Sequence, residues 1–303
     1  MNKHSKSFNQ IRWISLVWII ALFQIGCTGV ESARQNPVYF DLNHFYISMD
    51  SASFDAFREH PEILTNYFHA DSGMPEFQPV TDSTGIIYLR GESVYMELMG
   101  PENRFGVAQG VTGIGFSEDT QLPLDPQWKE KVDSLFQETG VEFGNNSYMI
   151  NGETISWFDT AYIPDTTTTI YTWYSRYNPE FLSAITGDTY SEYTRENYLK
   201  LARKGEKNVQ DITGLSLELN TDDYDRITLE LEQIGALPEK YDGNRDGSRY
   251  KVGQVLFDLY KENRSRLTEA RFRLAEASDC NYRAGTISLR CDGYRLAMRF
   301  GDV

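Results

Sequence analysis

Two side chains that can do chemistry, His44 and Glu97, are predicted to project from the same side of neighbouring strands. Alternation places His44 on the same face of its strand as Tyr46, and it places Glu97 with Tyr95. An imidazole and a carboxylate on adjacent rigid strands can ligate zinc, manganese or iron, or can act as an acid–base pair. Metal ligation and proton transfer both stay open for His44 and Glu97 on this geometry alone. The two tyrosines would contact a ligand in the same cleft.

The elements that position these residues follow a repeated order. Three segments of similar sequence are each predicted to form a strand followed by a helix. These openings of the modules begin at Leu42, Val111 and Ile212. Each predicted helix is followed by consecutive strands rather than by another helix. This order predicts an α+β fold whose mixed or antiparallel sheets curl around a cleft, with the helices on the outer face. The predicted boundaries are 41–108, 109–182 and 209–303 for three modules, and 183–208 for a connecting helix.

Two stretches far apart in the chain read as the same hairpin. They are GIIYLRGESVYMELMG and GTISLRCDGYRLAMRF, each with a turn predicted after Leu-Arg between two alternating strands. The alignment puts Ala297 at the place of Glu97. It also turns Arg295 and Arg299 toward the cleft of the third module. These arginines could hold a carboxylate or phosphate of a ligand, or could form salt bridges between sheets to Glu218 and similar acids.

A known family shares these features. The order of elements, the L-N-H-F-Y-I start and the Y-M-E-L-M-G-P hairpin end resemble the vicinal oxygen chelate superfamily, the glyoxalase and bleomycin-resistance group. The resemblance implies βαβββ modules and a divalent metal held by His44 and Glu97. It also implies metal-assisted lyase, isomerase or dioxygenase chemistry, in which Glu97 moves a proton. The chain is similar as well to an uncharacterised glyoxalase-like family of exported bacterial proteins.

The other modules do not repeat this pair of residues. Gly113 and Gly214 stand where His44 would recur, so a metal would need Glu218 or another carboxylate as a substitute. Three interpretations stay open for His44 and Glu97: a divalent metal site, a metal-free polar pocket, and a structural pair satisfied by its neighbours. Three openings also leave the pairing of modules open, within one chain or between copies in a homo-oligomer.

Aromatic residues indicate a different class of function. Tyr171, Trp173 and Tyr177 fall on one side of a predicted strand, and Trp157 and Phe158 lie nearby in the sequence. A row of flat rings can stack on sugars. A non-enzymatic glycan-binding or structural protein is therefore the alternative to a protein that binds a small organic ligand. The same row could instead be sheet core covered by a helix.

The amino terminus resembles a bacterial lipoprotein signal. Three basic residues precede an apolar run over 13–25, and Cys27 follows after one glycine. In this interpretation residues 1–26 are a signal peptide, Cys27 is lipidated, and residues 27–40 form a tether. The alternatives are an ordinary cleaved signal and an uncleaved anchor. We expect a lipid-anchored protein of the bacterial cell envelope, whose membrane contact is the lipid alone.

The composition of the chain limits the classes of molecule that it is expected to bind. Loss of residues 1–26 would remove three positive charges and no negative ones, which moves the formal net charge from -15 to -18. Such an acidic surface repels phosphate backbones, so the expected partner is a small molecule and not a nucleic acid. The sequence has no phosphate-binding loop, dinucleotide fingerprint or serine-nucleophile elbow. Cys280 and Cys291 could pair in an oxidising compartment or remain two buried thiols.

Overall fold

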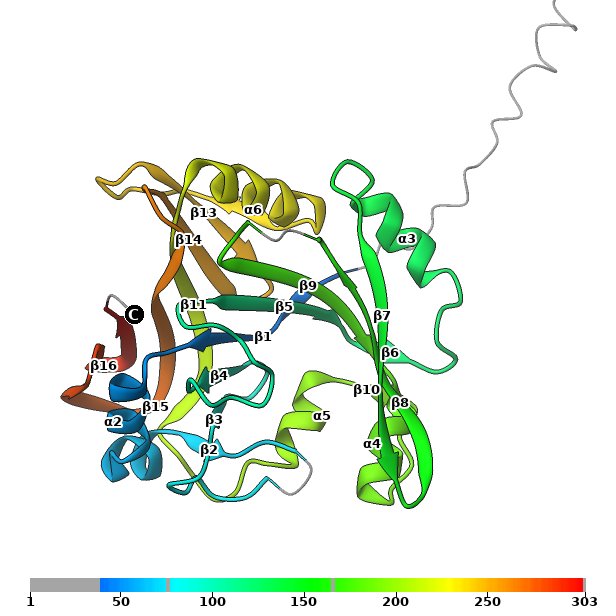
Figure 1. The fold of residues 1–303 in the computed structure, drawn as a ribbon, viewed down its shortest axis with the longest axis horizontal. Helices are drawn as coiled ribbons and strands as arrows, with labels where there is room; N and C mark the ends of the chain where they lie inside the picture. The colour runs from blue at the N-terminus through cyan, green and yellow to red at the C-terminus, as the bar shows by residue number, and fades with distance from the viewer. Residues whose placement is uncertain (1–38, 75–76, 165–166, 302–303) are drawn as a thin grey trace, which may run out of the picture. The chain divides into compact units, whose positions relative to one another are not determined.

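The computed structural model describes residues 39–74, 77–164 and 167–301 (Figure 1). The chain divides into two units, residues 1–37 and 38–303, and all described residues belong to the second. The predicted signal peptide and the predicted lipidation site at Cys27 lie outside the described residues, as does most of the tether.

One mixed sheet has the strand order β2-β3-β4-β1-β5-β9-β8-β7. Its strands are β1 (Asp41–Ser48), β2 (His69–Asp71), β3 (Ile86–Arg90), β4 (Tyr95–Met99), β5 (Thr112–Glu118), β7 (Glu142–Ile150), β8 (Glu153–Tyr162) and β9 (Ile170–Tyr177). β1 runs parallel to β4, β5 runs parallel to β9, and β1 pairs with β5 in antiparallel register. The first two modules therefore share one βαβββ topology and join through their first strands.

The second sheet has the order β12-β13-β14-β11-β15-β16. Its strands are β11 (Val209–Leu219), β12 (Leu237–Glu239), β13 (Gly247–Val252), β14 (Val255–Lys261), β15 (Arg266–Ala284) and β16 (Ile287–Phe300). β11 runs parallel to β14, as β1 does to β4. The place beside β11 that another module would take is occupied by the antiparallel hairpin β15–β16. The predicted α+β class with repeated βαβββ modules is confirmed, and the third module is completed within the chain.

The helices begin at capping residues that the sequence supplies. The helical segments are α2 (Ser51–Arg58), a π-helical turn (Ile63–Tyr67), α3 (Trp128–Leu135), α4 (Pro179–Thr186), α5 (Arg195–Lys200) and α6 (Thr221–Gln233). Asp50 caps α2 by accepting from the Ser53 N–H, and Asn220 caps α6 by accepting from the Asp223 N–H. Pro61 lies between α2 and the π-helical turn, where it divides the first predicted helix. None of the described helices has both the length and the apolar character to cross a bilayer.

Aromatic residues of the main core pack the two sheets against each other. The ring centroids of Phe116 on β5 and Phe257 on β14 lie 5.9 Å apart. Those of Phe68 and Phe272 on β15 lie 5.3 Å apart. All four side chains are buried. Their burial supplies a large part of the hydrophobic stabilisation that holds the sheets together.

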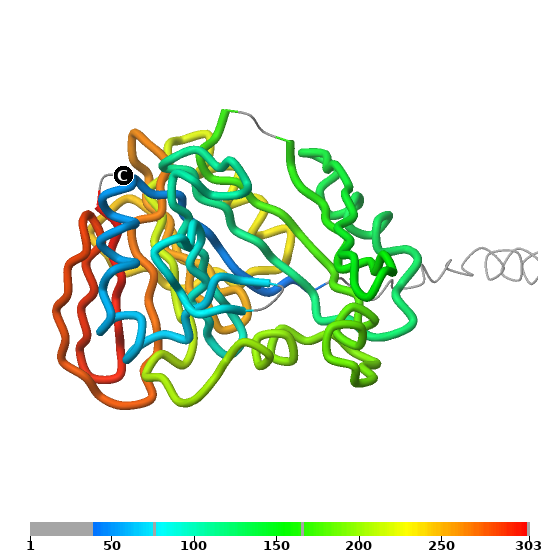
Figure 2. Tube along the Cα trace, turned by 60° about the horizontal axis from the view of Figure 1, so that its bottom comes forward, coloured from blue at the N-terminus to red at the C-terminus, as the bar shows by residue number. Residues whose placement is uncertain are grey.

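Two helices contact both sheets. α6 packs on β11 and β14, and its buried Glu230 accepts hydrogen bonds from Thr172 at 2.5 Å and from Tyr174 at 2.8 Å, both on β9. α2 runs alongside the long hairpin β15–β16, where Ser53 hydrogen-bonds to Thr286 (Figure 2). The helix-bearing face of the eight-stranded sheet is therefore covered, and its other face is the one left to form a cleft.

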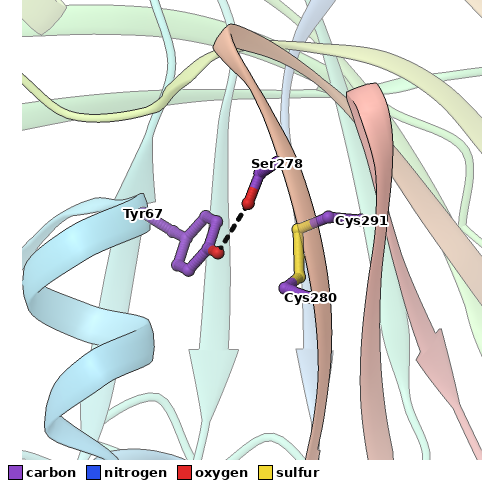
Figure 3. The surroundings of a disulfide bond; sticks show 4 residues. All are labelled: Tyr67, Ser278, Cys280 and Cys291. Atoms are coloured by element: carbon purple, nitrogen blue, oxygen red, sulfur yellow. Dashed lines mark hydrogen bonds between the residues drawn. A yellow bond between two sulfur atoms is a disulfide. The ribbon is translucent and has the colours of Figure 1, made fainter.

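Cys280 and Cys291, which the sequence left either paired or separate, form a disulfide between β15 and β16. They are directly opposite in the ladder, with Cα atoms 4.6 Å apart. Beside them Tyr67 hydrogen-bonds to Ser278 of β15 at 3.0 Å (Figure 3). The hairpin is thus fixed across its strands by the disulfide and to the first module by Tyr67.

The predicted repeat of the first hairpin is wrong. Residues 287–300 form the single strand β16, which continues through the predicted turn after Arg290. The counterpart of the β3–β4 hairpin is β13–β14, because β14 is the strand parallel to β11. Alternation has the same period in a hairpin and in one long strand, so this pattern could not distinguish the two.

The connecting region also differs from the prediction. In the region 183–208, where one connecting helix was expected, the chain forms β10 (Glu192–Tyr193) and then the short α5. β10 pairs with β6 (Thr120–Gln121), so residues 192–193 are extended rather than helical. α4 was not predicted, although Asn178 followed by Pro179 is a typical helix start.

Candidate functional site

A cavity of about 590 Å³ lies against the open face of the eight-stranded sheet. The lining residues are His44, Tyr46, Met74, Tyr88, Tyr95, Glu97, Met99, Arg104, Phe105, Val107, Asn146, Ser147, Tyr148, Trp157, Phe158, Trp173, Tyr177 and Tyr198. They come from both modules of the sheet, from the loop after β4 and from α5. The four residues predicted to line the cleft of the first module are all among them.

The imidazole of His44 is held in one orientation by its neighbours. Its Nδ1 lies 2.7 Å from Oδ1 of Asn43, and Nδ2 of Asn43 donates to Oγ of Ser117 at 2.8 Å. Because Oδ1 of the amide can only accept, Nδ1 carries the proton in this contact. Nε2 is then an acceptor on the side of Glu97. A register shift of β1 between Leu42 and His44 accompanies this contact between adjacent side chains.

Glu97 is a buried carboxyl group without an ionic partner. It is 6% exposed, and its Oε1 lies 3.8 Å from Nε2 of His44, beyond hydrogen-bond distance. Its carboxyl oxygens make no hydrogen bond to any residue that the structure describes. Burial raises the pKa of Glu97 to about 8, although the positive charges of Arg90 and Arg104 oppose the shift. Near neutral pH Glu97 is therefore mostly a neutral acid that can donate a hydrogen bond.

The imidazole of His44 is also neutral. Burial, together with the positive charge of Arg90, lowers the pKa of His44 to about 3. The ring stacks on Tyr95 at a centroid distance of 4.4 Å and meets Trp173 edge to face at 5.1 Å. Burial and the negative charge that Glu97 carries at high pH raise the pKa of Tyr46 to about 12. The floor of the cavity thus carries no net charge at neutral pH.

A buried ion pair supports this floor from behind. Arg90 of β3 donates to Asp71 of β2 from Nε at 2.5 Å and from Nη2 at 2.9 Å. The rings that surround its guanidinium carbon, at centroid distances of 5.1 to 5.8 Å, are those of Phe77, Tyr88, Tyr95 and Tyr198. Three of these rings line the cavity, so the cation–π contacts hold its wall in place.

The second module does not repeat the pair, because two aromatic rings take the space. Gly113 stands at the place of His44, and Trp173, paired with Gly115, stands at the place of Glu97. A Cβ atom at Gly115 would lie 2.5 Å from the Trp173 ring. One at Gly113 would lie closer still to the ring of Tyr46, and 2.7 Å from that of Trp173. These two rings therefore fill the space in which a second pair of ligands would stand.

The third module has an acidic residue at the place of Glu97, but arginines form ion pairs with it. Asp258, rather than the predicted Ala297, is the counterpart of Glu97, because it lies in the strand parallel to the first strand of its module. Arg249 and Arg271 both form ion pairs with Asp258, which is fully buried. This carboxylate has its partners within the protein and is not left for a ligand.

The donor set does not fit the divalent metal that the resemblance implies. Nε2 of His44 and Oε1 of Glu97 are close enough to reach one ion, but a metal site needs further protein ligands. The matching places in the second module hold a glycine and an indole. Across the described ranges, no three His, Cys, Asp or Glu side chains gather in a way that could hold a metal ion. The residues present form a polar pocket rather than a ligand set.

Arg295 and Arg299 lie outside this cavity. Both belong to β16 of the six-stranded sheet, and Arg299 pairs with Glu269 of β15 at 2.8 Å. That contact joins neighbouring strands of one sheet, whereas the alternative expected from the sequence was a salt bridge between sheets. The expected role in a ligand site depended on the hairpin repeat, which the structure does not contain.

Sequence reasoning missed several lining residues. Arg104, in the loop after β4, donates from Nη2 to the Tyr88 hydroxyl at 3.2 Å, and no pattern in its loop marks it. Tyr88 could have been found, because alternation in β3 places it opposite Glu97. Trp157 and Phe158 both line the cavity although they are adjacent in β8, since Trp157 is the extra residue at a register shift against β7.

The arrangement can exchange a proton with a bound molecule. Glu97, with a pKa of about 8, can donate a proton near neutral pH. The unprotonated Nε2 of His44 can accept a hydrogen bond, but its pKa of about 3 makes it a weak base. Glu97 is therefore the group of this pair whose protonation changes near neutral pH.

Glu97→Gln is expected to change the pH dependence of stability. The folded pKa of about 8 lies above the ordinary value of 4.5, so between these values the folded chain holds a proton that the unfolded chain has lost. This acid then makes the free energy of unfolding fall by about 1.4 kcal/mol per pH unit as the pH rises. His44 acts in the opposite sense only below its ordinary pKa of 6.5, so Glu97 dominates this pair from there to pH 8. Urea unfolding of both proteins measures the effect.

Between pH 6.5 and 8 the variant should gain about 2 kcal/mol of unfolding free energy relative to the wild type. Glu102→Gln, a change at an exposed carboxyl in the loop after β4, provides the control and should follow the wild type. Parallel pH profiles for Glu97→Gln and the wild type would contradict the raised pKa.

The chain was compared with solved structures, with proteins of curated function and with family models. Among solved structures, a hypothetical protein from Staphylococcus aureus has a TM-score of 0.49 at 12% sequence identity, over 84% of this chain and 98% of that one. A mutant of 4-hydroxymandelate synthase from Streptomyces coelicolor has a TM-score of 0.36 at 12% identity, over 74% of this chain and 63% of that one. No protein with curated function matches the chain. A family of unknown function matches residues 42–300, and the chain therefore belongs to that family, DUF5829.

Proposed function

We propose that the cavity binds a small organic molecule with a flat ring and a hydrogen-bond acceptor, without a resident metal. The observation that carries this proposal is Glu97, a carboxyl group buried at the floor with no hydrogen bond to any described residue. Glu97 borders the cavity, so the partner that buried polar groups nearly always have would be water or a ligand that occupies the cavity. A carbonyl or hydroxyl oxygen of a ligand could accept a hydrogen bond from the protonated Glu97 and supply that partner.

The aromatic walls favour a planar ligand. Trp157, Phe158, Trp173 and Tyr177 all line the cavity, and rings of this kind stack on flat organic molecules. Most of the aromatic row that the sequence offered for glycan binding thus faces inward. This supports recognition of a ring inside the cavity over binding of a glycan on an exposed surface.

A negative group on the ligand would meet Arg104. Arg104 is exposed, its guanidinium carbon lies 5.0 Å from the ring centroid of Phe105, and it donates to Tyr88. An arginine already ordered by contacts with two wall residues is well placed to bind a carboxylate through paired N–H groups. The expected ligand class is therefore a planar organic acid.

We also propose that the protein is exported and held in the bacterial cell envelope by a lipid on Cys27. The order of a basic start, an apolar run and Gly-Cys in residues 1–27 supports export and lipidation. The disulfide between Cys280 and Cys291 supports an oxidising compartment, because such bonds are rare where thiols are kept reduced. The lipid would be the membrane contact, and the cavity would face water.

Cys27→Ser should abolish lipid attachment. In a bacterial host fed radioactive palmitate, the wild type should carry label and sediment with membranes, whereas the variant should be unlabelled. The double variant Cys280→Ser with Cys291→Ser is the control, since it removes two other cysteines and should keep its label. A labelled Cys27→Ser protein, or an unlabelled wild type, would contradict the anchor.

The flat aromatic acid 6-hydroxy-2-naphthoate has a hydroxyl that can accept from Glu97 and a carboxylate that can meet Arg104. It should quench the fluorescence of Trp157 and Trp173 at a single saturable site. Glu97→Met should weaken this binding about tenfold, which corresponds to one lost hydrogen bond. The same change should raise the melting temperature, because it removes an unpaired carboxyl from the interior. Fluorescence titration and thermal unfolding measure the two effects.

Gly115→Ala and Gly144→Ala provide a matched pair for the same titration. A Cβ atom at Gly115 would lie 2.5 Å from the Trp173 ring, whereas one at Gly144 of β7 meets only a methyl group of Thr160 at 3.2 Å. The first change should displace the indole and abolish binding, and the second should leave affinity unchanged. Equal affinities for the wild type, Glu97→Met and Gly115→Ala would exclude the cavity as the binding site.

Divalent metals should not stabilise the protein. Zinc, manganese or iron(II) added to chelator-treated protein should shift the melting temperature by less than about 1 °C, because His44 and Glu97 offer only two ligands. The measurement is repeated with His44→Ala and with His60→Ala as its control. A shift of several degrees that disappears only in His44→Ala would overturn the metal-free pocket. It would favour the metal-assisted lyase, isomerase or dioxygenase chemistry instead.

A further inference from the structure

A second, apolar hollow of about 690 Å³ adjoins the cavity, and we call it the side groove. It is bordered by β7, α4 and the chain after β2. Its apolar walls include Met74, Met149, Ile150, Phe181, Ile185 and Leu201. Met149 is 67% exposed, and Ile150 and Ile185 are half-buried. The side groove therefore presents an apolar surface to water.

The side groove and the cavity share one wall. Met74 and Tyr148 border both hollows. Trp157 of the cavity stacks on Phe181 of the side groove, with ring centroids 5.0 Å apart and planes 20° apart. Tyr148 meets these two rings edge to face at 5.9 and 6.2 Å. The two hollows therefore adjoin at Met74 and Tyr148, and the stack of Trp157 on the fully buried Phe181 lies behind this shared wall.

We propose that the ligand is an amphiphile, with its planar head in the cavity and an aliphatic chain in the side groove. The inference rests on the proposed function for the head and adds the chain. Apolar surface that is continuous with a binding cavity is best explained by a part of the same ligand. A molecule whose head reaches Glu97 can extend past Met74 and Tyr148 over apolar side chains.

The charge of the side groove favours a hydrocarbon over a polar tail. Of the described side chains that line it, only Asp188 carries a charge, and none is a cation. A phosphate or sulfate group would find no counter-charge there and would meet a carboxylate. An uncharged chain gains from leaving water, by about fourfold in dissociation constant for each methylene group that is fully buried.

A series of 4-alkylbenzoates tests the chain separately from the head. Benzoate carries the ring and the carboxylate alone, and 4-butyl-, 4-hexyl- and 4-octylbenzoate add methylene groups. The chain from residue 28 onward is used, because it lacks the apolar run over 13–25 and the lipid, so that no detergent competes for the side groove. It keeps the whole compact unit of residues 38–303. Dissociation constants from tryptophan fluorescence should fall about two- to fourfold per methylene until the side groove is filled, and then level off.

Substitutions in the side groove locate the chain. Ile185→Gln and Met149→Gln should flatten the dependence on chain length and leave the affinity for benzoate within about twofold, because the head site is untouched. Leu237→Gln is the matched control, since Leu237 on β12 is 63% exposed and outside both hollows. It should keep the full dependence.

The outcomes separate this inference from the proposed function. If benzoate binds and longer chains bind no better, the amphiphile is excluded and the head site stands. If no member of the series binds, the proposed function fails as well. A dependence that persists in both side-groove variants would place the chain elsewhere and overturn the inference. A change in sedimentation of the ligand-free variants would instead identify the side groove as an interface between copies of this chain.

Discussion

The burial of Glu97 without a cation is the constraint on which the site depends. Arg90 stands on the neighbouring strand and would be the natural partner. However, two of its nitrogens already donate to Asp71, and aromatic rings enclose its guanidinium. Glu97 therefore stays protonated near neutral pH and presents its hydrogen-bonding capacity to the cavity.

The three described modules differ in what fills the space beside the first strand. The first has an acid, an imidazole and a cavity. In the second, Gly113 and Gly115 make room for Trp173, which turns that half of the sheet into a wall of the same cavity. In the third, two arginines neutralise Asp258. The backbone topology is shared, so the difference in chemistry arises from side-chain size and charge.

Strand alternation was enough to place His44 and Glu97 on one face, because residues 44–48 of β1 pair with β4 in unbroken register. It could not place Trp157 beside Phe158, because a bulge in β8 interrupts the period. The sequence also could not predict that Glu97 has no ionic partner. This depends on the ion pair between Arg90 and Asp71, and Asp71 lies on β2, a strand of three residues without a recognisable pattern.

A neutral floor and a charged edge set the orientation of a ligand. An anionic group at the floor would lose its hydration without meeting a free cation, because Arg90 is already paired. The same group beside Arg104 keeps contact with water and gains an ionic partner. An uncharged acceptor therefore points toward Glu97, and the anionic group points outward. Once the acceptor and the anionic group are bound, the apolar part of the molecule can contact Met74 and Tyr148, which border both hollows.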